Sequence, residues 1–404
     1  MTVVAQESGM ATQFDLGRYQ IIADGYTEAG GLLNRAIRDM PAQGGTIALG
    51  PGDYRLEEPI QIQRNNISLI GAGREATRLL VDNDLGCGVM VGSPHSRASR
   101  ISIADLTVNT SHPLATGCGV QFNGAYDVKM WRCLIANMNC GVEVLNSSFV
   151  YLTDLEIIDP RAHEGVGVLV HGDRVHNDQY LTRVFVQCPG ASEPCEVGFR
   201  IANSQGIWVN SCGAFHCGIG LHLVATPDRW LEHVFLSNNA MDNCVASGFR
   251  IDSSPSGSVR RVQSTGDWSS SNRGAGILVV DHYDAVHDVA FRGARLYNNG
   301  EHGVAINGGS HISIDGSSIA GNGRLDPASS GIHVESCKLL MVRNNTIGAY
   351  SGFGPTHNYG ISGLDRVGRG LISGNVFEAS RTATFDSVND KVAMHGNLDL
   401  QGVQ

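Results

Sequence analysis

The sequence predicts an all-β solenoid in which short parallel strands stack as about 11–13 coils. From about Ile67 to Val376 a unit of roughly two dozen residues recurs. Each unit has a short apolar alternation, a turn residue, a second apolar pair, a loop and a G-V-x-V-like strand. The same stretch lacks the 3.6-residue apolar spacing of a helical solenoid. Because a solenoid lengthens by adding coils, we expect the 404 residues to form one elongated domain.

The expected elements follow one another along the chain. Residues 1–24 lack periodicity and are interpreted as an N-terminal arm, ahead of a single domain over 25–404. Residues 27–40 carry apolar side chains at helical spacing, with Thr27 as the expected N-cap. This helix would cover the open end of the solenoid, where raw strand edges otherwise invite aggregation. The coils are expected over 46–385, and residues 386–404 are expected to form a terminal strand or tail.

Cysteine and asparagine positions repeat with the coils. Five of the ten cysteines lie just before or within the G-V-x-V-like strand, which predicts one inward ladder of buried thiols: Cys87, Cys118, Cys140, Cys217 and Cys244. No Cys-x-x-Cys zinc pattern occurs. Cys188 and Cys195 bracket a loop and are candidates for a disulfide in an oxidising compartment. Paired asparagines at turns are expected to hydrogen-bond from coil to coil: Asn238, Asn239, Asn298, Asn299, Asn344 and Asn345.

Charge and hydropathy exclude some partners. The net charge of −10 argues against nucleic acid, which needs a basic stripe on the protein. It gives no support for binding to an anionic membrane surface, and no run of 18 apolar residues predicts a membrane span. The first residues lack the charged and apolar regions of a conventional secretory signal. The expectation is therefore a protein that stays where it is made, or leaves by another route such as lysis or assembly on a particle.

The segment Asp24–Leu56, with D-G-Y-T-E-A, G-G-T-I-A-L and G-P-G-D-Y-R-L, resembles the N-terminal signature of the pectate-lyase-like superfamily. The resemblance implies a right-handed parallel β-helix over most of the chain. Members include polysaccharide lyases, glycoside hydrolases, epimerases, fructan-cleaving transferases and phage tailspikes. The chain looks most like phage or prophage tailspike-type depolymerases, and this likeness implies a homotrimer. Motifs similar to those of alginate epimerases, polygalacturonases and pectate lyases are absent, so the resemblance leaves the chemistry open.

Residues 205–300 are the expected site. Aligning the coils places four residues in one column, His216, Asp242, Ser269 and Tyr297, and four in a column two residues earlier, Ala214, Ala240, Asp267 and Arg295. Asp242 and Asp267 would then lie on adjacent coils as a carboxylate pair that cleaves glycosidic bonds by hydrolysis or glycosyl transfer. Glu232 and His216 would tune or orient the pair.

Other residues of the same region would bind a polysaccharide or oligosaccharide. Sugars stack on indoles, so Trp208, Trp230 and Trp268 are expected to line the groove. An alternative is a lyase, which needs a base and a cation for the substrate carboxylate. Its candidates are His216, Tyr297, Arg229, Arg273 and Arg295. No metal or cofactor is expected, except Ca²⁺ in the case of a lyase. A glycan-binding adhesin and a structural fibre subunit are further alternatives.

A second polar cluster lies on loops one to three coils earlier: Asp159, His163, Glu164, Asp173 and His176. Such residues either line the same groove or form solvated loops.

Overall fold

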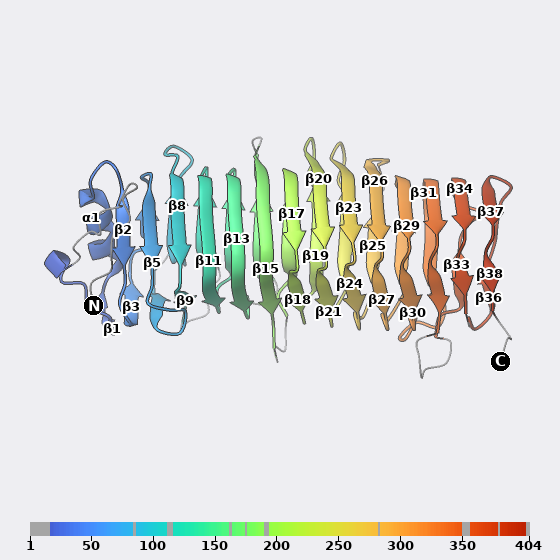
Figure 1. The fold of residues 1–404 in the computed structure, drawn as a ribbon, viewed down its shortest axis with the longest axis horizontal. Helices are drawn as coiled ribbons and strands as arrows, with labels where there is room; N and C mark the ends of the chain where they lie inside the picture. Colours follow the sequence, from blue (N-terminus) through green and yellow to red (C-terminus); the bar gives the residue numbers. More distant parts are fainter. Residues whose placement is uncertain are drawn as a thin grey trace, which may run out of the picture.

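The computed structural model describes residues 17–83, 86–110, 116–160, 164–173, 176–189, 194–281, 283–349, 356–378 and 380–400. The chain forms a parallel β-solenoid of about 13 turns with one short α-helix at its N-terminal end, so the predicted fold class is confirmed. The coils follow one another along the long axis from α1 to the C-terminus (Figure 1). Among the described residues no helix is long and apolar enough to cross a membrane.

Each coil contributes strands to three columns of parallel strands. The first column holds β4 (Ile60–Ile62), β7 (Val89–Gly92), β10 (Cys118–Asn123), β12 (Cys140–Leu145), β14 (Val166–His171), β16 (Val197–Ala202), β19 (Ile219–Ala225), β22 (Phe249–Ser253), β25 (Ile277–Val280), β28 (Val304–Asn307), the start of β31 (Ile332–Arg343), β33 (Tyr359–Ser362) and β36 (Ala383–Phe385).

The second column holds β2 (Gly45–Ala48), β5 (Ile67–Ile70), β8 (Ser99–Ala104), the first parts of β11 (Tyr126–Ala136), β13 (Ser148–Ile158) and β15 (Asn177–Gln187), then β17 (Gln205–Asn210), β20 (Trp230–Ser237), β23 (Ser258–Thr265), β26 (Val286–Arg292), β29 (Ser310–Asp315), the end of β31, β34 (Val367–Ser373) and β37 (Val392–His395).

The third column holds β1 (Asp24–Glu28), β3 (Gly52–Leu56), β6 (Thr77–Val81), β9 (Thr107–Asn109), the ends of β11, β13 and β15, then β18 (Gly213–Phe215), β21 (Ala240–Asp242), β24 (Trp268–Ser270), β27 (Arg295–Tyr297), β30 (Ser318–Ala320), β32 (Thr346–Gly348), β35 (Val376–Phe377) and β38 (Leu398–Asp399). β37 and β38 lie in the segment expected to form a terminal strand.

The predicted capping helix is α1 (Gly30–Asp39), which follows the short 3₁₀ turn η1 (Gly17–Tyr19). Leu33 and Ile37 of α1 join the apolar core and so cover its N-terminal end. The expected N-cap at Thr27 is wrong, because Thr27 donates its hydroxyl to Asp24. The N-cap residue is Ala29, and Oε1 of the preceding Glu28 accepts from the backbone N–H of Gly31 at 2.7 Å, which satisfies one donor of the first turn.

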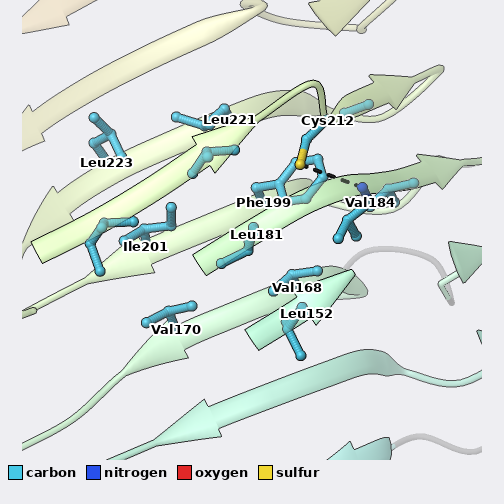
Figure 2. Packing of buried hydrophobic residues seen from close by; sticks show 14 of the residues in the cluster. Leu152, Val168, Val170, Leu181, Val184, Phe199, Ile201, Cys212, Leu221 and Leu223 are labelled. Carbon is cyan, nitrogen blue, oxygen red and sulfur yellow. Dashed lines mark hydrogen bonds between the residues drawn. The ribbon is translucent and has the colours of Figure 1, made fainter. Parts of the chain in front are cut away.

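Alternating apolar residues from all three columns fill the interior. Figure 2 shows Leu181, Val184, Phe199 and Leu221 packed in one section of this core. Cys212 lies among them, and its Sγ accepts from the backbone N–H of Val184 at 3.5 Å. A column of glycines lets strands of the first column begin close to this core: a Cβ added at Gly119 would meet Cγ2 of Ile135 at 2.4 Å.

The predicted asparagine ladder is confirmed for the second residue of each pair. Asn239, Asn299 and Asn345 are buried, and the side-chain oxygen of each accepts from a backbone N–H of the preceding coil. The first residue of each pair has a different role. Asn238, Asn298 and Asn344 adopt the left-handed backbone with φ between 53° and 57°, which asparagine tolerates better than most residues.

The prediction that the cysteines are buried is confirmed, but the single ladder is wrong. All ten cysteines are free and buried. Cys87, Cys118 and Cys140 form a small separate cluster with Val166, packed against the side chains of Met90 and Leu169. Cys217 and Cys244 instead belong to the main core. In the strand register Cys140 aligns through Val166 and Val197 with Ile219, so Cys217 lies two residues before the position of the first cluster.

Candidate functional site

The predicted columns over residues 205–300 are wrong by one residue at two coils. In the structure Phe215, Asp242, Ser270 and Tyr297 follow one another in register, so the expected members His216 and Ser269 are displaced. His216 takes a left-handed backbone with φ 59° just after β18, and Ser269 is fully buried. A shift of one residue moves a side chain to the opposite face of a strand, so the two expected groups separate.

The carboxylates of Asp242 and Asp267 do not form a pair. Asp242 is half-buried at the end of β21 and accepts from the Ser270 hydroxyl at 2.7 Å. Asp267 lies three residues before Ser270, roughly 10 Å further along the strand direction. It is only 2% exposed and accepts from the backbone N–H of Asn239 at 2.8 Å. Asp267 is therefore a member of the interior ladder rather than of a surface site.

Burial is the main influence on Asp267. It raises the pKa of this carboxyl to about 6, against hydrogen bonds from Ser264 and Asn239 that lower it. The two residues expected to orient the pair lie elsewhere. Glu232 is buried in β20, where it forms ion pairs with Arg260 at 2.8 Å and Arg261 at 2.7 Å. His216 is exposed at its turn.

The predicted sugar-binding residues are spread over different faces. Trp208 stacks between Tyr180, at 4.6 Å between ring centroids, and Phe235, at 5.4 Å. Trp268 is 44% exposed in the third column, where it pairs with Arg295 of the next coil. Two further residues of this region were expected at the site. Arg273 lies on the turn after the third column, and Tyr297 lies at the end of β27.

Arg229 and Trp230 are different, because Arg229 lies on the turn between the first and second columns and Trp230 begins β20 directly after it. A trough runs along this edge of the solenoid, with a volume of ≈ 800 Å³. Its lining comes from the turns of six successive coils, from β7–β8 to β19–β20: Ser93, Pro94, His95, Arg97, Asn123, Gly124, Leu145, Asn146, Ser148, His171, Gly172, Asp173, Asn203, Thr226 and Arg229. Five coil steps of about 4.8 Å make the trough about 24 Å long.

Turn length shapes the trough. The turns that line it differ in length: 124–125 and 146–147 have two residues each, whereas 93–98, 172–176 and 226–229 are longer. Arg97 lies at one end, with its guanidinium 4.5 Å from the ring centre of Tyr126, and Arg229 lies at the other. Among the described lining residues Asp173 is the sole carboxylate, and the two guanidiniums of Arg97 and Arg229 supply positive charge at the two ends of the trough.

A histidine–carboxylate dyad lies at the edge of the trough. Nε2 of His171 is 2.7 Å from Oε1 of Glu143, and Gln121 donates to the other oxygen of Glu143 at 2.7 Å. Burial would raise the pKa of Glu143, but the hydrogen bonds from His171 and Gln121 outweigh it and hold the pKa below its usual value. Glu143 is thus ionised at neutral pH and can only accept. His171 therefore donates from Nε2, and a neutral ring has the lone pair on Nδ1.

A second dyad lies on the same outer face of the first column. Nε2 of His222 is 2.8 Å from Asp252, which also accepts from Arg250 at 2.8 Å. The ring of His222 is 12% exposed, and its Nδ1 is buried with no hydrogen-bond partner among the described residues. The geometry therefore makes His171, at 33% exposure, the more accessible base of the two.

A smaller cavity opens beside the Arg229 end of the trough. Its lining includes Gly172, Ser204, Arg229 and Trp230, with His176 behind them. His176 is 1% exposed, and burial, assisted by the charge of His171, lowers its pKa to about 4. The neutral ring accepts or donates at Nδ1 with the Ser204 hydroxyl at 3.2 Å. This part of the site therefore contains a histidine that stays uncharged at neutral pH.

The second predicted cluster is divided by the structure. Asp173 lines the trough and His176 the smaller cavity. Asp159 follows β13 and Glu164 is exposed before β14, while His163 lies outside the described residues. Sequence reasoning missed Glu143, His171 and Arg97. The signal for the dyad was available: Glu143 and His171 occupy outward positions of two successive G-V-x-V-like strands.

Comparisons with known proteins agree with this architecture. A family model described as a right handed beta helix region matches residues 118–288 and 271–398. No curated protein sequence matches the chain. Among solved structures, the A-module of the Azotobacter vinelandii mannuronan C-5 epimerase AlgE4 has a TM-score of 0.59 at 16% identity, covering 94% of this chain and 99% of that chain.

Two further structures are similar at comparable identity. Tailspike protein 3 of bacteriophage CBA120 has a TM-score of 0.74 at 14% identity, covering 95% of this chain and 61% of that chain. The DFA-IIIase from Arthrobacter chlorophenolicus A6 in complex with GF2 has a TM-score of 0.58 at 14% identity, covering 90% of this chain and 94% of that chain. Identities this low support a shared fold, and chemistry has to come from the residues of the site.

Proposed function

The chain belongs to the right-handed β-helix family, and on that premise we propose that it is an enzyme that cleaves an acidic polysaccharide in the trough by β-elimination. The observation that carries the proposal is the His171–Glu143 dyad at the edge of a trough that has an arginine at either end. The names of the similar structures favour a carbohydrate substrate, since they include a mannuronan epimerase and a phage tailspike.

Elimination needs a base that removes the proton next to the carboxylate of a uronate ring. In the proposal Nδ1 of His171 takes this proton, and the ionised Glu143 stabilises the resulting imidazolium. The electron pair of the broken C–H bond forms a carbon–carbon double bond, and the bond to the neighbouring glycosidic oxygen breaks. The leaving oxygen then takes up a proton from water, and the imidazolium of His171 returns its proton to water. The chain is cut without addition of water, and one product carries an unsaturated uronate.

The substrate carboxylate needs a positive partner, because negative charge develops on it as the proton leaves. Arg229, already expected in this role, is the nearer candidate at two coil steps from His171, or about 10 Å, and Arg97 at three coil steps would meet the carboxylate of a neighbouring uronate. These guanidiniums provide the charge that Ca²⁺ would otherwise supply, so the proposal includes no metal. Trp230, 40% exposed beside Arg229, offers an indole face for a sugar ring.

This proposal takes the place of hydrolysis by a carboxylate pair. Retaining and inverting glycosidases use two carboxylates that face each other across the scissile bond. Asp267 lies in the interior, and Asp173 is the sole carboxylate among the described lining residues of the trough. The homotrimer implied by the resemblance stays a prediction, which sedimentation analysis of the purified protein would check.

The test is incubation of the full chain with a panel of acidic polysaccharides, with reducing ends and the ultraviolet absorbance of unsaturated uronates measured together. We expect both signals to rise in parallel. His171→Asn should lower the rate by about 10²–10⁴-fold, the usual contribution of a general base, and Glu143→Gln should lower it as well. His216→Asn is the matched control, since His216 is exposed on a different turn, and it should keep the wild-type rate.

The other outcomes refute the proposal in different ways. Reducing ends without absorbance would mean hydrolysis. Binding of a polysaccharide without either signal would assign the trough to a glycan-binding adhesin. Loss of activity on chelation that Ca²⁺ restores would show that the arginines are insufficient.

A further inference from the structure

Three cysteine side chains meet inside the solenoid near the turn after the third column. The Sγ atoms of Cys188, Cys195 and Cys217 all lie within 4.8 Å of one another. Cys188 directly follows β15, Cys195 lies shortly before β16, and Cys217 follows β18 in the next coil. All three thiols are free, and none of the three residues is more than 2% exposed. The cluster therefore brings together two successive coils and the connection between them.

The spacing of the sulfurs fits a single metal ion. A zinc–sulfur bond of about 2.3 Å places three sulfurs around one ion roughly 4 Å apart. Sulfurs already within 4.8 Å of one another can reach that arrangement through small side-chain rotations. Because the three donors are all sulfur, the cluster selects soft cations over Ca²⁺ and Mg²⁺, which prefer oxygen.

We propose that Cys188, Cys195 and Cys217 bind one soft metal ion, zinc(II) or copper(I), through three thiolates. Three sulfur–metal bonds form as the thiols release their protons, and the oxidation states of sulfur and metal stay unchanged. The ion would join the end of β15, the start of β16 and the coil of β18. This site is separate from the trough, which lies between the first and second columns, and so goes beyond the proposed catalytic function.

The experiment uses the full chain, refolded under reducing conditions with zinc(II), with cobalt(II) or with copper(I), then desalted. The readouts are metal content per chain and, for the cobalt(II) form, thiolate-to-metal charge-transfer absorption. We expect one tightly held metal ion per chain in the wild type. Cys188→Ser and Cys217→Ser should each lose at least about ten-fold of the metal affinity, since each removes one ligand. Cys133→Ser is the matched control, because Cys133 is equally buried but lies outside the cluster.

A wild-type measurement keeps the proposal testable if the variants fail to fold. The midpoint of thermal unfolding should rise with zinc(II) and fall again when a chelator removes it, since a ligand that binds the folded state stabilises it. A wild-type chain that retains no metal, or a Cys188→Ser variant that retains it fully, would refute the site. Peptide mapping that finds a Cys188–Cys195 disulfide in the native protein would also refute it and would favour the sequence-based expectation instead.

Discussion

Replacing Asp267 with asparagine should make the protein more stable above about pH 6. Asp267 occupies a ladder position at which other coils carry an amide, as at Asn239 and Asn345. In those coils the side-chain Nδ2 donates to a backbone carbonyl of the preceding coil. Asn239 donates to Val209, and Asn345 donates to Ile314. An ionised carboxylate has no such donor. Asparagine would keep the oxygen that accepts from Asn239 and put the missing N–H in place of Oδ2. The Ser264 hydroxyl, which now donates to Oδ2, would then accept from the amide, as the Ser269 hydroxyl does from Asn272.

The size and sign of the effect follow from the pKa of Asp267, which burial raises from 3.8 to about 6. Below pH 3.8 the carboxyl of Asp267 is protonated in both the folded and the unfolded chain. The folded protein then has its full stability, because no charge is buried at this position. Between pH 3.8 and about 6 the unfolded chain ionises first, so stability is lost as pH rises. A shift of about two units corresponds to roughly 3 kcal/mol, which is lost completely above pH 6.

The assay is unfolding of wild type and Asp267→Asn between pH 3.5 and 8, in steps of about half a unit. The difference in unfolding free energy should grow in favour of the variant by up to roughly 3 kcal/mol and then stay constant. Titrating histidines affect both proteins equally and cancel in this difference. Asn345→Asp is the reverse control and should lose stability as pH rises. A pH-independent difference would refute the reasoning, and loss of polysaccharide cleavage in Asp267→Asn would return Asp267 to the catalytic site.

Three further predictions concern the scaffold. Gly119→Ala should lower the free energy of unfolding by about 1–3 kcal/mol in thermal or denaturant unfolding, because its Cβ would overlap Ile135. An unchanged midpoint would mean that the core has room for this methyl group. Trp208→Ala should lower the free energy of unfolding by at least about 1–3 kcal/mol, because it removes two ring stacks. The rate of cleavage in the trough should stay at the wild-type value. A loss of cleavage without a loss of stability would assign Trp208 to substrate binding. Glu232→Gln should lower the free energy of unfolding by about 1–2 kcal/mol, because two partly exposed arginines lose their buried partner. A lower cleavage rate without a loss of stability would favour a catalytic role for Glu232.

The sequence predicts the architecture well because each coil repeats the same local physics. Alternating apolar residues give strands of period two, and asparagine at a turn hydrogen-bonds to the coil beside it. Both signals recur along the chain, so an error in one coil does not change the fold. The exception at the N-terminus is local. Thr27 has the chemistry of an N-cap, but its hydroxyl donates to Asp24. The helix begins later, with Ala29 as its N-cap and Glu28 accepting from a first-turn N–H.

The candidate site was harder to predict, because it depends on the register of single residues. His216 was aligned with Asp242, but its left-handed backbone displaces it from the strand column, and the column continues through Phe215 instead. The trough also depends on differences in turn length between coils rather than on any one motif. The dyad joins Glu143 and His171 diagonally across adjacent strands, 28 positions apart in sequence.

The strand pairs that hold the coils together join neighbours along the long axis of the solenoid (Figure 1). A force that pulls the two ends apart therefore loads the coil-to-coil interfaces in series, and every interface carries the same tension. The weakest interface then sets the mechanical strength of the whole rod, however strong the others are. Above pH 6 the interface that contains the ionised Asp267 is a candidate for the first rupture, so proton concentration would set the force at which the rod begins to unwind.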